Sequence, residues 1–289
     1  MISEAQYTKV DSEIQALLQM PNKQYATLAP KLEALISDTY GALRTDTNPV
    51  ITNLPHWDID DLKFLVKEYS GFSNESIHMF YDATIRLRWD GVKAEVDRNV
   101  AEEMGALTDG IPHLELMRRG YREDLGVETD GVEYSACTRG FLDRMRSCFR
   151  NANNAFVCGA LLAFEATATF EFKGVEKILK TLKARQGGEI AKNSLTGIYI
   201  QGHVADAAPG GNPEDDHYAG MRNAIGKYVT AENASDLVRG FVSVCTALNA
   251  WWEQLAIEVY VNRLTRRTQA EPRGNEAHAP PARAAEVRA

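Results

Sequence analysis

Residues 160–179 have the sequence ALLAFEATATFEFKGVEKIL, in which Glu165 is enclosed by apolar and small side chains. Helical spacings of three, four and seven residues place around it Cys158, Leu161, Leu162, Ala168, Thr169 and Phe172. No Lys or Arg occurs between Asn151 and Glu171, so this helix offers the carboxylate no cation. A charge facing a core is costly unless it is paired, protonated or metal-bound. We therefore expect Glu165 to be buried and to be compensated in one of three ways: by a metal ion, by an Arg from a distant part of the sequence, or by a raised pKa that keeps it protonated.

The same periodicity recurs along most of the chain, and the period-two pattern of strands is nearly absent, which predicts an all-α fold. Helices are expected at residues 3–20, 25–44, 58–69, 75–88, 91–104, 112–125, 138–172, 174–185, 189–206, 214–228 and 231–266. Gly71 and Gly105 are among the predicted helix breaks. We expect one helical, metal-binding catalytic domain over residues 1–268 and a disordered tail, rich in Ala, Pro, Glu and Arg, over residues 269–289.

Composition excludes some classes of partner. The formal net charge of -8 argues against nucleic acid. The basic cluster Arg263, Arg266 and Arg267 is interpreted as a complement to the dipole of the last helix. The longest uncharged apolar run, Ala155 to Phe164, is too short to span a membrane. Four cysteines without a CxxC pair, and no basic-then-apolar leader, predict a cytoplasmic protein with reduced thiols.

Further acidic and basic side chains are predicted to face the core. Glu103 continues the stripe of Val96 and Val100, whereas Glu102 falls outside it. His113 lies on the apolar side of the next predicted helix. Each has an ordinary alternative: Glu103 at a helix end can reach solvent, and a lone His is often a hydrogen-bonded core residue.

His203 and His217 lie on the apolar faces of two later helices. Glu214 comes three residues before His217 and Asp206 three residues after His203, so either acid can stand beside a histidine. The resulting set of carboxylates and imidazoles from several helices suits a pair of iron or manganese ions, whereas a structural zinc site would use cysteine.

Two segments resemble the heme-oxygenase-like diiron oxidases and oxygenases. The first is NVAEEMGALTDGIPHLELMRRGYREDLG, from Asn99 to Gly126, and the second is residues 160–179. The resemblance covers roughly Asp82 to Met221 and implies a single-domain heme-oxygenase-like helical bundle. The metal ligands that it implies, which are also the catalytic residues, are Glu103, His113, Glu165, His203 and His217.

One departure from that family concerns the second iron site. The family has HxxxDxxH on one helix, but here a Pro-Gly-Gly insertion separates the two histidines and Ala207 stands where the aspartate is expected. Glu214 or Asp206 would then complete the site, or the site would stay incomplete.

The resemblance implies two iron ions, cycling between Fe(II) and Fe(III), with O2 as co-substrate. The expected substrate is a small molecule derived from an amino acid or a fatty acid, and the expected reaction is desaturation, N-oxygenation, nitrile formation or C–C cleavage in a biosynthetic pathway. A homodimer and an external electron donor are compatible with it. The alternatives are a metal-free TenA-like hydrolase using Cys137 or Cys158, a cofactorless oxidase, and a non-catalytic helical interaction protein.

Overall fold

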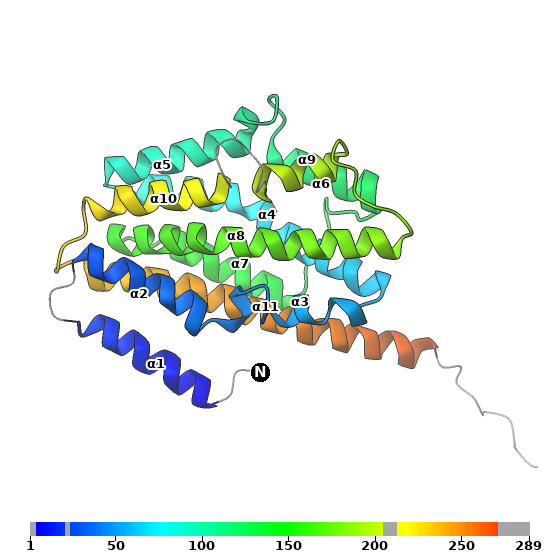
Figure 1. The fold of residues 1–289 in the computed structure, drawn as a ribbon, viewed down its shortest axis with the longest axis horizontal. Coiled ribbons are helices and arrows are strands. Elements are labelled where there is room, and N and C mark those ends of the chain that lie inside the picture. Colours follow the sequence, from blue (N-terminus) through cyan, green and yellow to red (C-terminus); the bar gives the residue numbers. More distant parts are fainter. Residues whose placement is uncertain (1–3, 21–23, 205–212, 271–289) are drawn as a thin grey trace, which may run out of the picture.

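The regular structure of this chain is helical throughout the part that the computed structural model describes, residues 4–20, 24–204 and 213–270 (Figure 1). The α-helices are α1 Glu4–Leu18, α2 Tyr25–Asp38, α3 Pro49–Thr52, α4 Ile59–Arg86, α5 Asp90–Ala101, α6 His113–Leu125, α7 Ala136–Phe149, α8 Asn154–Arg185, α9 Leu195–Val204, α10 Pro213–Gly226 and α11 Ala234–Ala270. Short helical turns are η1 Gly41–Leu43, η2 Leu54–His56 and the π turn η3 Glu102–Ala106. The predicted all-α, single-domain fold is confirmed. Of the predicted tail, residues 271–289 lie outside the described residues.

Helix α8 lies near the middle of the bundle and packs against α11, α10 and α4 (Figure 1). It begins where the Asn153 side chain accepts a hydrogen bond from the backbone of Phe156, a standard N-cap. Among the described helices, α8 is the one long and apolar enough to cross a membrane, with a mean hydropathy of 1.4 in its most apolar window. Because 67% of that window is buried inside the protein, α8 has the character of a core helix.

Two glycines allow α8 and α11 to approach closely. A Cβ added at Gly159 of α8 would lie 1.9 Å from the carbonyl oxygen of Leu237, and one added at Gly240 of α11 would lie 1.9 Å from that of Phe156. Neither space can hold a methyl group. The close packing of α8 against α11 therefore requires glycine at both positions.

Some predicted helix boundaries were wrong. Gly71 does not break a helix, because it lies inside α4 with the ring of Tyr134 packed 3.1 Å from where its Cβ would be. The predicted helix 138–172 is divided between α7 and α8, and α8 continues past the expected break to Arg185. Burial along α8 overrides the local cost of Gly174.

The basic cluster at the end of α11 has a more specific partner than the helix dipole. Arg263 and Arg266 both bind the carboxylate of Asp61, which is fully buried in the first turn of α4. Asp61 also completes the capping box of α4 with Asp58. The end of the last long helix is thus tied to the start of α4, a function that helical periodicity did not indicate.

Candidate metal centre

The predicted ligands come together in two neighbouring groups, built from five parts of the chain. One group consists of Glu103, His113 and His203, from η3, α6 and α9. The other consists of Glu165, Glu214 and His217, from α8 and α10. Within each group the candidate ligand atoms all lie within 4.8 Å of one another. Asp206 lies outside the described residues, so its part in the prediction stays open.

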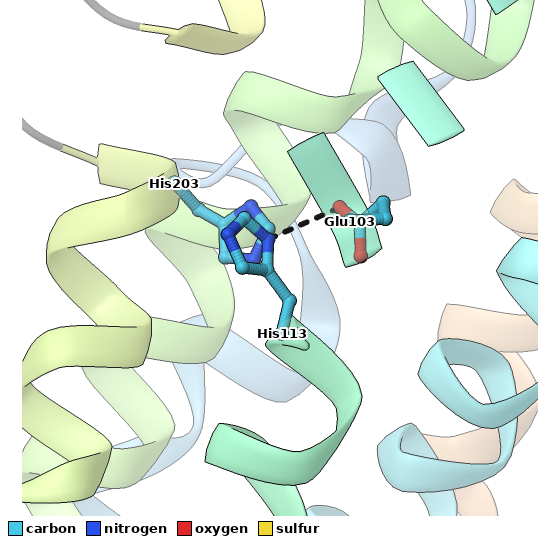
Figure 2. Close-up of side chains that lie close together, drawn as sticks. All are labelled: Glu103, His113 and His203. Carbon is cyan, nitrogen blue, oxygen red and sulfur yellow. Dashed lines mark hydrogen bonds and ion pairs between the residues drawn. The ribbon is translucent and has the colours of Figure 1, made fainter. Parts of the chain in front are cut away.

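Figure 2 shows the first group, in which Glu103 meets His113 across the junction of η3 and α6. The two side chains are 3.3 Å apart at Oε1 and Nδ1. The rings of His113 and His203 stand nearly perpendicular, with centroids 4.7 Å apart. On both rings Nε2 is buried without a hydrogen-bond partner. A buried ring nitrogen without a partner is costly, and a bound cation is one group that would satisfy it.

Glu214 joins the two groups. Its Oε1 lies 2.8 Å from Nδ1 of His203, and its Oε2 lies 3.8 Å from Nδ1 of His217. The same His217 nitrogen is 4.0 Å from Oε2 of Glu165. Glu214 therefore occupies the position between two clusters that a carboxylate shared by two metal ions would take.

The buried carboxyls have opposite electrostatic surroundings. Burial raises the pKa of Glu165 to about 8, against the opposing influence of His217 and of Asn99. Burial also acts on Glu214, but hydrogen bonds from His203 and His217 outweigh it and lower the pKa to about 2. For His217 burial is outweighed by Glu214 and Glu165, which raise its pKa to about 9. The described residues that line this cavity include an excess of acidic groups and no Lys or Arg, which suits a divalent cation.

The interpretation of Glu102 as facing away from the site was wrong. Its Oε2 lies 2.6 Å from Nε2 of His217, and its other oxygen accepts a hydrogen bond from Arg98. Glu102 lies on the flank of α5 that packs against α10, beside the valine stripe that marked the core-facing side. No sequence signal marked Glu102, because Glu95 and Arg98, seven and four residues earlier, share this side and make it look solvated.

Two more polar residues near the site were missed from the sequence. Asn99 donates a hydrogen bond of 2.8 Å from Nδ2 to Oε1 of Glu165 and so fixes that carboxyl. Glu171, on α8, is buried with its Oε1 unpaired. Both line the same cavity as the candidate ligands. Helical spacing could have indicated both, because Asn99 lies three residues after Val96 and Glu171 lies three residues after Ala168.

The cavity is lined by residues of α4, α5, η3, α6, α8, α9 and α10, and aromatic side chains stand beside the candidate ligands. These include Tyr69, Phe72, Phe80, Phe164, Phe172 and Tyr199. The ring of Phe172 stacks on His203 at a centroid distance of 3.9 Å and holds that imidazole in place. The cavity can thus exclude water from the two groups of ligands while leaving room for a small molecule.

Neither cysteine proposed for the hydrolase alternative lines this cavity. Burial and, to a smaller extent, the neighbouring carboxyl of Glu258 raise the pKa of Cys137 to about 12, against the opposing hydroxyls of Ser135 and Thr138. Burial also raises the pKa of Cys158. A nucleophilic cysteine needs the opposite shift, toward the thiolate.

The profile of the DUF3865 family, a domain of unknown function with solved structure, matches residues 26–258. The chain belongs to this family. It is similar to a CADD-like protein of unknown function from Nostoc punctiforme PCC 73102, known from two crystal structures. In both comparisons the sequences are 27% identical and the TM-score is 0.72.

The alignment is nearly complete on the side of the Nostoc protein. It covers 81% of this chain and 98% of that chain for one crystal structure, and 82% and 96% for the other. No curated protein sequence matches this chain. Kinship and fold are therefore established together, and the activity must be argued from the site itself.

Proposed function

We propose that this protein is a non-heme diiron enzyme that uses O2 to oxidise or oxygenate a small organic molecule. The observation that carries the proposal is the pair of Glu/His groups joined by Glu214, in a cavity whose described lining contains no Lys or Arg. The resemblance to the heme-oxygenase-like diiron oxidases and oxygenases agrees with it, and adds amino-acid- or fatty-acid-derived substrates as the expected class.

The donor set fits iron or manganese better than structural zinc. Glu103, His113 and His203 would hold one ion, and Glu165, Glu214 and His217 would hold the other. All six donors are carboxylates or imidazoles, and none of the four free cysteines belongs to either group. When bound, two iron ions supply the electrons that reduce O2 and thereby provide the oxidant.

The protein's own contribution is to hold these donors on rigid helices and to enclose the substrate. Asn99 orients Glu165, and Glu102 hydrogen-bonds the far nitrogen of His217, so both act on the orientation of proposed ligands. The aromatic lining packs around the substrate and excludes water from the reacting position.

Iron binding tests the proposal directly. The full chain, purified without oxygen, is titrated with Fe(II), and the iron bound per chain is measured with the visible absorption on exposure to O2. We expect roughly two ions per chain and a transient band that depends on O2. Glu165→Ala should lose iron, whereas Glu176→Ala, which changes a carboxylate on the same helix paired with Lys180, should keep it. Absence of iron binding in the unmodified protein would contradict the proposal.

A further inference from the structure

Glu171 is a buried acid that the candidate metal groups do not use. It lies on α8, six residues beyond Glu165, which corresponds to about 9 Å along the helix axis. The residue is 5% exposed, and its Oε1 has no hydrogen-bond partner. Burial raises its pKa to about 8, against the smaller opposing influence of Thr167. A carboxyl in this state gains from any ligand that brings a compensating charge.

The position of Glu171 is at the inner end of the cavity. A second cavity shares Ser73, Ser76, Glu103 and Leu114 with the first and continues outward to Met104, which is exposed. The first cavity therefore opens to the surface through the second one, near Ser76 of α4. Tyr69 lies two turns further along the same helix, beside the tryptophans of α11. Glu171 lines the same cavity as Tyr69, on the helix α8 that packs against α4.

The chemistry of the inner end favours a cation. No Lys or Arg is among the described residues that line the cavity, so a carboxylate or phosphate head group would find no partner there. Aromatic rings, including those of Tyr69 and Phe72, attract cations through their faces. A protonated amine would both satisfy the unpaired oxygen of Glu171 and neutralise it.

We propose that Glu171 binds the protonated amino group of the substrate at the inner end of the cavity, with the carbon to be oxidised held near Glu165. This inference rests on the proposed function and narrows its substrate class to amines. The rise of about 9 Å between Glu165 and Glu171 along α8 favours an amine with a short aliphatic chain. A fatty acid with its carboxylate at the inner end, against Glu171, is disfavoured, because Arg118, the arginine among the described residues that line the connected cavities, lies at the outer one.

Small probes test the proposal without knowledge of the natural substrate. Binding of n-pentylamine, pentanoate and 1-pentanol to the full chain is measured by titration calorimetry, with the protein first metal-free and then loaded with Zn(II). We expect pentylamine to bind in both states more tightly than the other two probes. Glu171→Gln should weaken its binding at least about tenfold while the bound iron per chain stays unchanged. Equal binding of pentanoate or pentanol would overturn the proposal.

Two further variants keep the test sharp. If Glu165→Gln removes pentylamine binding and Glu171→Gln does not, the amine sits among the proposed metal ligands and the proposal is wrong. Glu171→Asp keeps the carboxylate but shortens the side chain by one methylene. The longer n-hexylamine should then reach it better, so its affinity should rise relative to that of pentylamine. Iron binding is measured separately, so the two proposals can fail separately. If the chain binds no iron but binds the amine through Glu171, the diiron proposal is wrong. If it binds iron but no amine, the proposal for Glu171 is wrong.

Discussion

Glu214 lies where the two groups of candidate ligands meet, and its two oxygens face different histidines. The heme-oxygenase-like diiron oxidases, which this sequence resembles, place an aspartate between the histidines of one helix, but this chain has Ala207 there. A glutamate from the following helix, α10, reaches the same two rings instead. The position of an oxygen in space, more than its place in the sequence, decides whether it can serve as a ligand.

Replacing Glu214 should therefore affect both proposed metal positions. We expect Glu214→Ala to lower iron affinity at least about tenfold and to reduce the iron content to about one ion per chain or less. Asp216→Ala, an exposed acid on the same helix, is the control and should keep the full content. Metal analysis of the two variants and of Asp206→Ala decides which acid completes the second site. Loss of iron in Asp206→Ala alone would assign that role to Asp206.

At this scale, the sequence indicated those residues whose burial follows from helical spacing. Glu165 could be recognised because apolar neighbours surround it on every helical spacing and no cation lies nearby in its helix. Glu102 could not, because Glu95 and Arg98 share its side of α5 and make that side look solvated. Only the packing of α10 against this flank brings Glu102 to His217.

Among the elements, α8 has two roles, as the central helix of the bundle and as the support of Glu165 and Glu171. Its apolar character could be predicted, but its bounds could not. The break before it depends on the Asn153 cap, and the absence of a break at Gly174 depends on burial along the whole helix. Long-range packing decides both, which local propensity does not describe.

The contact between α8 and α11 predicts a strong effect of a very small substitution. Gly159→Ala would force a methyl group onto the carbonyl oxygen of Leu237, so we expect a loss of about 1–3 kcal/mol or more in the free energy of unfolding. Gly140→Ala in α7 has open space around it and should be neutral or stabilising by about 0.5–1 kcal/mol. Urea unfolding compares the two variants, and equal stability would show that the helices are less closely packed than described.

On the scale of the whole molecule, the proposed ligands come from η3, α6, α8, α9 and α10, which are spread over more than a hundred residues of sequence. A metal ion bound at such a site connects helices that otherwise meet only through side-chain packing. Binding to the folded state alone also stabilises that state by mass action.

Metal should therefore raise the thermal stability of the whole domain. At a free Fe(II) concentration one hundred times the dissociation constant, the expected gain is about 2.7 kcal/mol for each ion bound. For a domain of this size that corresponds to an increase in Tm of roughly 5–10 °C. Anaerobic calorimetry measures the shift, a chelator should reverse it, and Glu165→Ala should not show it. An unchanged Tm in the unmodified protein would exclude tight, fold-specific metal binding.

The ion pairs of Arg263 and Arg266 with Asp61 affect where the C-terminal end of a folded fragment can be placed. The family profile ends at residue 258, before both arginines. A fragment cut at that boundary would retain the buried Asp61 carboxylate but lose the two cations that neutralise it. We therefore expect a fragment that folds on its own to extend at least through Arg266.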